Sequence, residues 1–138
     1  MHTIKLKFLA FFCIIEFSLI ACSAGKGVEA VNVREIISHP ARYVGKEVSL
    51  TGCYLSGRHG TSVYDCQDRS ELLRVSIPPG VAESAKGKLL IERGYSQWPP
   101  GAEVVIPLNV RGVLSRIDDG GIDFEIQEVL SVGDATRP

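Results

Sequence analysis

The segment YVGKEVSLTG, residues 43–52, decides the fold of this 138-residue chain. From Glu47 onward, polar residues alternate strictly with apolar or small residues as far as Gly52. Alternation with a period of two predicts a strand that buries one face. A glycine inside such a strand removes a side chain where the strand bends sharply. The segment therefore predicts a curved, half-buried first strand that begins near Val44.

The residues after this segment predict two further strands. Residues 62–66 form the hairpin partner of the first strand, across a loop at residues 55–60 that contains Gly57 and Gly60. A third strand, residues 72–77, ends at a Pro-Pro-Gly sequence, which stops regular structure.

A helix and two more strands complete the pattern. Residues 81–93 are rich in Ala, Glu, Lys and Leu without alternation, which favours a short helix that an internal glycine weakens. Residues 103–114 predict a long fourth strand, kinked or bulged near Pro107 because proline cannot donate to a central ladder. The Asp-Asp-Gly-Gly turn at residues 118–121 leads into an alternating fifth strand, residues 122–127.

A short helix is expected before the first strand. Four apolar residues lie between positions 31 and 37, and His39-Pro40 follows them. Because the residue before a proline disfavours the helical conformation, the helix is predicted to end there.

The predicted order is that of a small five-stranded OB-fold-like barrel, with a helix between strands three and four. The opening segment, with Gly-Lys before its strand, resembles the start of small exported OB-fold domains, and VRGVL at residues 110–114 resembles the start of their paired fourth and fifth strands. A β-sandwich would need about seven strands. We therefore expect a mainly β, OB-fold-like domain over residues 30–132 and a flexible tail over residues 133–138.

The amino-terminal residues carry the pattern of a secretion signal. Lys5 and Lys7 precede an apolar run at residues 8–20, shorter than the about 20 residues that a transmembrane helix needs. The run closes with Leu-Ile-Ala-Cys at residues 19–22, which resembles the lipobox of bacterial lipoprotein signals.

The resemblance to bacterial lipoproteins implies a signal peptide over residues 1–21, acylation of Cys22 and a lipidated tether over residues 22–29. In that family the cysteine thiol receives a diacylglycerol and the new amino group is acylated, so the lipid bilayer becomes a partner of the chain. In Gram-negative lipoproteins, an Asp directly after the lipidated cysteine favours retention in the inner membrane. This chain has Ser23 at that position, so the resemblance implies the outer membrane, with the protein facing the periplasm, if the source is Gram-negative. A secretion signal with an incidental cysteine is the alternative.

Cys53 and Cys66 remain once the signal and the lipidated cysteine are set aside. An exported protein meets an oxidising compartment, where two cysteines most often pair. Each lies at the end of a predicted strand, on either side of one loop, so we expect a structural disulfide. Free thiols are one alternative, and a metal site that would also use His59, Asp65 and Asp68 is another.

The sequence shows no catalytic motif, phosphate loop or usual metal-ligand spacing, so we expect no enzyme activity, no cofactor and no metal. A formal net charge of −1 gives no basic excess for sequence-independent nucleic-acid binding. OB-fold ligands contact aromatic and basic residues over the second and third strands and the loops. The candidate partner-binding residues are Tyr54, Arg58, Tyr64, Arg74 and Trp98. Alternatively, Trp98 folds back over the open end of the barrel.

These features favour a non-enzymatic envelope lipoprotein that binds an envelope protein or glycan through exposed side chains of its first three strands. An OB-fold module for nucleic acid or another anionic ligand is the alternative, although export argues against nucleic acid as the partner. A thiol-redox or hydrolytic enzyme is a third hypothesis. Cys53 and Cys66 are its only reactive candidates, and their spacing differs from Cys-x-x-Cys.

Overall fold

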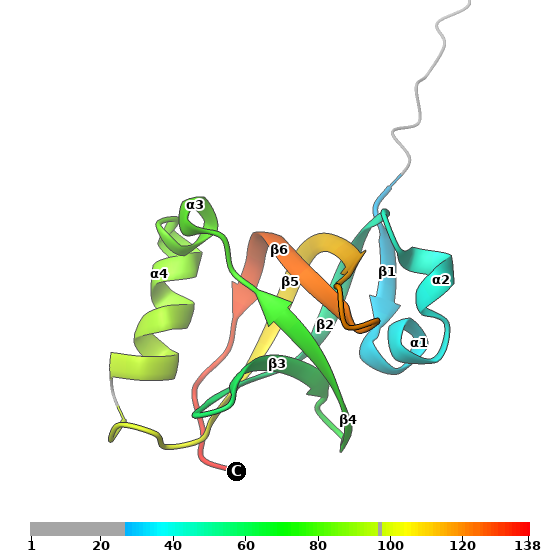
Figure 1. Ribbon diagram of the computed structural model, residues 1–138. Helices are drawn as coiled ribbons and strands as arrows, with labels where there is room; N and C mark the ends of the chain where they lie inside the picture. The colour runs from blue at the N-terminus through cyan, green and yellow to red at the C-terminus, as the bar shows by residue number, and fades with distance from the viewer. Residues whose placement is uncertain (1–26, 97) are drawn as a thin grey trace, which may run out of the picture.

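The computed structural model describes residues 27–96 and 98–138, which are mainly β, with few and short helices (Figure 1). Six strands pair into one sheet whose pairing closes in a ring. The elements in chain order are β1 (Glu29–Asn32), α1 (Val33–Ser38), α2 (Pro40–Tyr43), β2 (Glu47–Gly57), β3 (Gly60–Asp65), β4 (Asp68–Ser76), α3 (Pro79–Ala82), α4 (Ala85–Ile91), the π-helical turn η1 (Glu92–Ser96), β5 (Val104–Arg116) and β6 (Ile122–Val132). The predicted signal peptide, Cys22 and most of the tether lie outside the described residues. No helix in the described part of the chain is long and apolar enough to cross a membrane.

The ring is organised by β2, which is paired along both edges. One edge runs antiparallel to β5, from the Glu47–Val113 pair to the Ser56–Val104 pair. The other edge pairs with β1 over residues 48–51 and with β3 over the following residues. From β3 the pairing continues through β4 and β6 back to β5, and the β4–β6 step is parallel. β1 is therefore an addition to β2 beside a closed circuit made by the other strands.

The expectation of five strands is wrong, because β1 is a sixth strand. It is four residues long and buries only Val31, so its pattern is too short to show alternation. Asn32 ends it and caps α1, since its side chain accepts a hydrogen bond from the Glu35 N–H at 2.8 Å. The predicted short helix is present, but it begins at Val33 and ends before His39.

The strand boundaries also differ from the predicted ones. β2 runs to Gly57 and β3 resumes at Gly60, whose φ of 109° suits glycine, so their connection is Arg58-His59 rather than a six-residue loop. Cys53 consequently lies within β2 and not at its end.

The predicted helix at residues 81–93 is divided into α3, α4 and η1. Ser84 begins α4 because its hydroxyl accepts a hydrogen bond from the Gly87 N–H at 3.0 Å. A Cβ at Gly87 would lie 1.9 Å from the carbonyl oxygen of Val81. Gly87 therefore allows α4 to approach the preceding turn closely, a role that its helix propensity does not show.

The predicted fourth strand corresponds to β5, and it is bulged shortly after Pro107 rather than at the proline itself. The register of β5 against β6 shifts after Asn109 and again after Arg111. Pairing with β6 begins only at Leu108, so the missing N–H of Pro107 falls outside that ladder.

Two strand glycines are required by close approach of neighbouring strands. A Cβ at Gly52 would lie 2.6 Å from a methyl carbon of Val63. At Gly112 it would lie 2.2 Å from the carbonyl oxygen of Glu125 and within 3 Å of the Phe124 ring. These glycines thus permit the tight curvature of β2 and β5.

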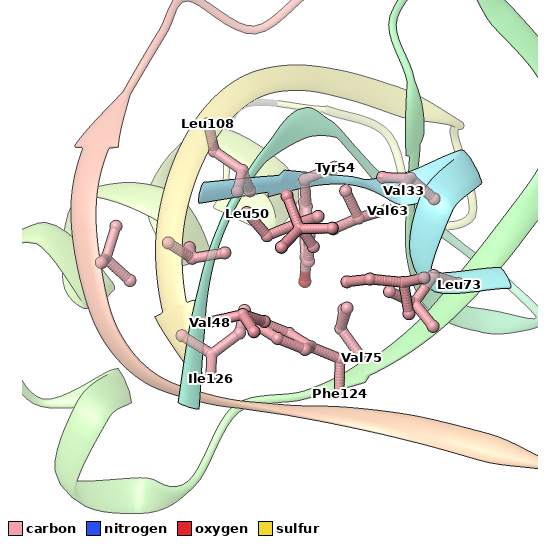
Figure 2. Packing of buried hydrophobic residues seen from close by; sticks show 14 of the residues in the cluster. Val33, Val48, Leu50, Tyr54, Val63, Leu73, Val75, Leu108, Phe124 and Ile126 are labelled. Atoms are coloured by element: carbon pink, nitrogen blue, oxygen red, sulfur yellow. The ribbon is translucent and has the colours of Figure 1, made fainter. Parts of the chain in front are cut away.

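The interior of the ring holds the main hydrophobic core, as Figure 2 shows. The alternation predicted for residues 47–52, which form the first part of β2, is confirmed. Their apolar side chains, Val48 and Leu50, are buried in the core, whereas Glu47 and Thr51 are exposed. The labelled core residues are Val33, Val48, Leu50, Tyr54, Val63, Leu73, Val75, Leu108, Phe124 and Ile126.

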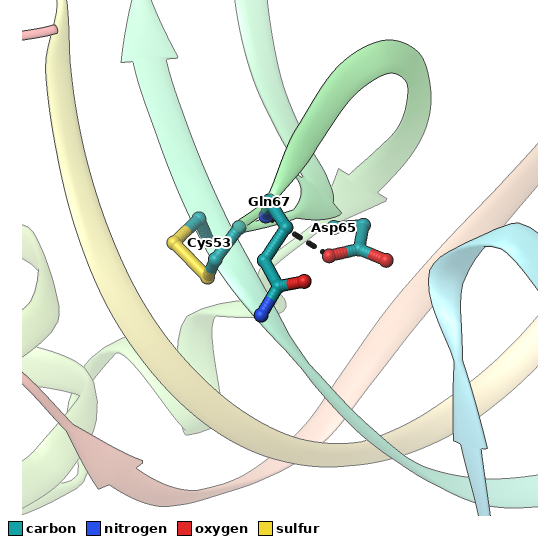
Figure 3. The surroundings of a disulfide bond; sticks show 4 residues. Cys53, Asp65 and Gln67 are labelled. Carbon is teal, nitrogen blue, oxygen red and sulfur yellow. Dashed lines mark hydrogen bonds between the residues drawn. A yellow bond between two sulfur atoms is a disulfide. The ribbon is translucent and has the colours of Figure 1, made fainter.

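A second buried cluster lies on the outer face of β2, β3 and β5, where it contains Cys53, Leu55, Tyr64 and Val105. The predicted disulfide joins Cys53 to Cys66 (Figure 3). Beside it, the Asp65 side chain accepts a hydrogen bond from the Gln67 N–H at 3.0 Å and closes the β3–β4 turn. The disulfide closes a loop of about 14 residues, which lowers the stability of the unfolded chain by about 3 kcal/mol in the chain-entropy model.

The segment 133–138, expected to be flexible, is held against β5 by backbone hydrogen bonds. The Gly133 N–H donates to the Pro107 carbonyl at 2.6 Å, and Val105 and Thr136 exchange two hydrogen bonds at 2.8 and 2.9 Å. These bonds extend the pairing of β5 beyond the end of β6.

The close approach at Gly112 predicts a specific sensitivity. Gly112→Ala is expected to lower the free energy of unfolding by about 3 kcal/mol, because the methyl group meets a backbone oxygen that cannot move freely. Gly57→Ala is the control, since its nearest contact is a flexible Glu103 carbon at 3.6 Å. Denaturant titration measures both, and equal effects of the two variants would contradict the argument.

Candidate functional site

A cavity of about 210 Å³ lies where the end of β2 meets the segment that leads from η1 into β5. Strand pairing fixes its β2 side, because Ser56 is held opposite Val104 and Gly57 opposite Gly60. The described residues that line it are Ser56, Gly57, Arg58, Gly94, Tyr95, Trp98, Pro99, Pro100, Gly101 and Ala102. Two of the predicted partner-binding residues, Arg58 and Trp98, therefore meet at one cavity from segments far apart in the sequence.

Arg58 is held at the rim of the cavity by packing against Gly101. A Cβ at Gly101 would lie 2.5 Å from Arg58 Nε and 3.3 Å from Cζ, and the φ of Gly101 is 79°. Only glycine satisfies both the turn and the contact with the guanidinium group. Arg58 is exposed and forms no ion pair with the described residues, so its charge is available to a ligand.

Trp98 is half-buried, packs against the main core and lines the cavity. Its ring packs against the main core, and its indole N–H donates to the Arg93 carbonyl at 2.9 Å. The Arg137 guanidinium lies 5.3 Å from the ring centroid, which is a cation–π distance. The indole is thus held in place by the core and by its hydrogen bond, and it also forms part of the cavity wall.

Ser56 is the buried polar residue of the site. It is 2% exposed and lines the cavity. A Cβ at Gly94 would meet Ser56 Cβ at 3.7 Å and side-chain carbons of Ile106 and Tyr54 at 3.8 Å, so this glycine packs closely on the end of β2 and on the core.

Tyr54 does not present an exposed surface, contrary to the expectation. It is 1% exposed, and its ring points into the core (Figure 2). Its hydroxyl has no hydrogen-bond partner among the described residues. Burial, followed by the nearby Tyr95 hydroxyl, raises the pKa of Tyr54 well above its ordinary value.

Tyr64 is likewise buried, at 6% exposure, within the outer cluster beside the disulfide. The Arg69 guanidinium lies 5.9 Å from its ring centroid and is paired with Glu103 at 2.9 Å. The expectation of an exposed Tyr64 is wrong because the outer face of β3 is covered at this point.

Arg74 is exposed but belongs to a different hollow. It lines a space of about 410 Å³ with His59 and Thr61, and its Nε lies 3.6 Å from an Asp123 carboxylate oxygen. The Ser76 hydroxyl donates to the same carboxylate at 2.7 Å. Arg74 is therefore already partnered and lies apart from Arg58 and Trp98.

The sequence did not single out Tyr95, Ser56 or Gly94. Tyr95 is 51% exposed, and its position three residues before the tryptophan was the one available signal. The burial of Ser56 could not be predicted, because a serine in a strand pattern gives no indication that its side chain will be buried once the strands close into a ring. The described residues contain no group of three or more His, Cys, Asp or Glu able to hold a metal ion.

Comparison with protein-family models, with curated proteins and with solved structures finds no match to this chain.

Two buried tyrosines provide a test of the unpartnered hydroxyl. Tyr54→Phe is expected to raise the free energy of unfolding by about 1 kcal/mol at neutral pH, because it removes a buried polar group without a partner. Tyr43 is equally buried, but its hydroxyl donates to Glu35 at 3.0 Å, so Tyr43→Phe is expected to lower stability.

The raised pKa of Tyr54 also predicts how the stability of the protein depends on pH. Because the folded-state pKa of Tyr54 is raised, its neutral form contributes stability below about pH 10 that is lost as the pH rises further. Denaturant titrations at pH 7 and pH 10.5 are expected to show a smaller alkaline loss for Tyr54→Phe than for the unaltered chain. A stability loss from Tyr54→Phe at pH 7 would contradict the assignment.

Proposed function

We propose that this protein is an envelope lipoprotein, anchored through an acylated Cys22, whose domain is a non-enzymatic OB-fold binding module for an envelope glycan or protein. The observation that carries the binding proposal is the cavity at the end of β2. There, Arg58, Ser56 and the aromatic residues Tyr95 and Trp98 face one space. Aromatic and arginine side chains dominate binding surfaces because they bury large areas and make forked hydrogen bonds at modest entropic cost.

The strand pairing supports the OB-fold proposal. OB-folds are partly open five-stranded Greek-key barrels, and they bind ligands on strands two and three and on the first and last inter-strand loops. The circuit β2–β3–β4–β6–β5 contains a helical segment between its third and fourth strands in chain order, as that fold requires. The connection Arg58-His59 corresponds to the first of those loops, so the cavity occupies a position that the fold uses for ligands.

The position of β1 supports an orientation for the anchored protein. A tether from Cys22 to the start of β1 at Glu29 reaches about 25 Å when fully extended. β1 lies beside the beginning of β2, whereas the cavity lies at the end of β2. In Figure 1 the start of β1 and the C-terminus of the chain lie at opposite ends of the molecule. The segment before β5 lies near the C-terminus. The proposed anchor would therefore hold the cavity away from the membrane surface.

The alternative of single-stranded nucleic acid is disfavoured by burial of the two tyrosines. Such binding needs aromatic side chains on which successive bases stack. Tyr54 and Tyr64, which were to supply this surface, are both buried. A thiol enzyme is disfavoured as well, because Cys53 and Cys66 are joined to each other.

Lipidation has a direct test. Cys22→Ala is expected to abolish incorporation of labelled fatty acid and to accumulate the uncleaved precursor, since the acceptor thiol is removed. Two or three acyl chains bury enough methylene groups, at about 0.8 kcal/mol each, for stable anchoring. Metabolic labelling and fractionation measure both effects, with Cys13→Ala as the matched control. Undiminished labelling of Cys22→Ala would refute the anchor.

Binding through the cavity is tested by affinity capture from envelope extracts with the acylated protein. Arg58→Ala combined with Tyr95→Ala is expected to lose the captured partner, because both residues are exposed at the cavity. Arg116→Ala, an exposed arginine at the opposite end of β5, is expected to retain it. Capture that is unaffected by the double variant would place the binding site elsewhere.

A further inference from the structure

We propose that the groove between β6 and the segment α3–α4 binds an extended peptide that carries a carboxylate, and that the peptide adds a short strand to the edge of β6. The groove has a volume of about 460 Å³. In Figure 1, α3 and α4 stand beside β6, and both contact it. The groove shares no lining residue with the cavity at the end of β2, so it is a separate site.

The edge of β6 that faces the helices loses its strand partner partway along the strand. β4 pairs with this edge at Phe124 and Glu125, and no described strand pairs with it beyond that point. β4 ends at Ser76, and two prolines, which have no N–H to donate, then lead the chain into α3. The groove lies where β4 departs, with residues 127–129 of β6 as one wall. A peptide in the groove would occupy the position beside β6 that β4 leaves.

Bulges in β6 place backbone groups outside the regular ladder at this position. The register of β5 against β6 passes over Gln127 and Leu130, so neither residue has a partner in β5. The Leu130 carbonyl instead accepts a hydrogen bond from Lys86 Nζ at 2.6 Å. Gln127 lines the groove and has no strand partner in the described part of the chain. This edge therefore takes hydrogen bonds from outside the sheet, and an extended peptide supplies them along its backbone.

The helical wall of the groove is held in place and is built from small side chains. The Ser84 hydroxyl donates to the Val81 carbonyl at 2.7 Å and so ties the start of α4 to α3. Gly80, Ser84 and Ala85 line the wall, and a Cβ at Gly80 would meet no atom within 4 Å. Protein interiors are closely packed, and a helix that only shielded the sheet edge would fill this space with larger side chains.

Lys86 gives the groove its charge preference. Among the described lining residues, Lys86 and Glu128 carry the charges. Glu128 forms an ion pair with Arg111, whereas Lys86 has no carboxylate partner among the described residues. An ammonium group has three donors, and the Leu130 carbonyl uses one of them. A carboxylate on the peptide would accept a charge-assisted hydrogen bond from another.

The test uses the full chain and capped, biotinylated pools of seven-residue peptides. The central residue is fixed as Glu in one pool and as Lys in another, and the other positions are mixtures of Ser, Thr and Val, which favour extended backbone. Surface plasmon resonance is expected to show about fivefold more binding of the Glu pool than of the Lys pool. A third pool, the Glu pool with methylated backbone nitrogens, is expected to lose binding, because strand addition needs N–H donors.

Three variants place the binding in the groove. Ala85→Trp puts an indole into the groove from an exposed position, so it is expected to abolish binding of the Glu pool without lowering the thermal unfolding midpoint. Glu83→Trp, at an exposed residue outside the lining, is the matched control and is expected to retain binding. Lys86→Met is expected to remove the preference for Glu over Lys while binding still requires unmethylated backbone.

Hydrogen exchange locates the peptide directly, because the Glu pool is expected to slow exchange of the backbone N–H groups of residues 126–130 and not those of β1. Equal binding of the methylated pool would overturn strand addition, and equal binding of the Glu and Lys pools would overturn the charge assignment. Binding that survives Ala85→Trp would overturn the groove as the site, and no binding of any pool would overturn the peptide as its occupant. These outcomes are independent of capture through Arg58 and Tyr95, which tests the cavity alone.

Discussion

The antiparallel pairing of β2 with β5 is the interaction on which the rest of the structure depends. It runs from Glu47–Val113 to Ser56–Val104 and closes the ring, so it decides which side chains of both strands face inward. A shift of one residue would turn every inward side chain of β2 to the outer face. Gly112 lies within this pairing, at a point where any Cβ would meet the backbone of β6. The requirement for glycine therefore follows from closure of the ring itself.

Closure also explains why the chain has two buried clusters. The inner face forms the main core, while the outer face of β2 is covered where the disulfide, β3 and the segment after β6 meet. Thr136 pairs with Val105, and Arg137 lies over Trp98, so the last residues link the outer cluster to the cavity end. The disulfide at Cys53 lies on this same outer face, and it restrains β2 a few residues before Ser56.

The sequence predicted what depends on local pattern and missed what depends on the ring. Alternation in residues 47–52 predicted the first part of β2, the glycine turn near residue 120 predicted the last hairpin, and the expectation of export predicted the disulfide. β1 was missed because a four-residue strand carries no periodic signal. Tyr64 was expected to be exposed because a strand pattern does not reveal that its outer face is covered. Burial on both faces arises only from tertiary structure.

The same reasoning applies to the candidate site. Arg58 and Trp98 were named as candidates from residue type, because aromatic and arginine side chains are frequent at binding surfaces. That they meet was not predictable, since they are forty residues apart and are joined by the pairing of β2 with the start of β5. Ser56 is the reverse case, a residue of no distinction in the sequence that is buried and lines the cavity in the folded chain. Its burial follows from the pairing of Ser56 with Val104 at the end of β2, a long-range contact that no local pattern in the sequence reveals.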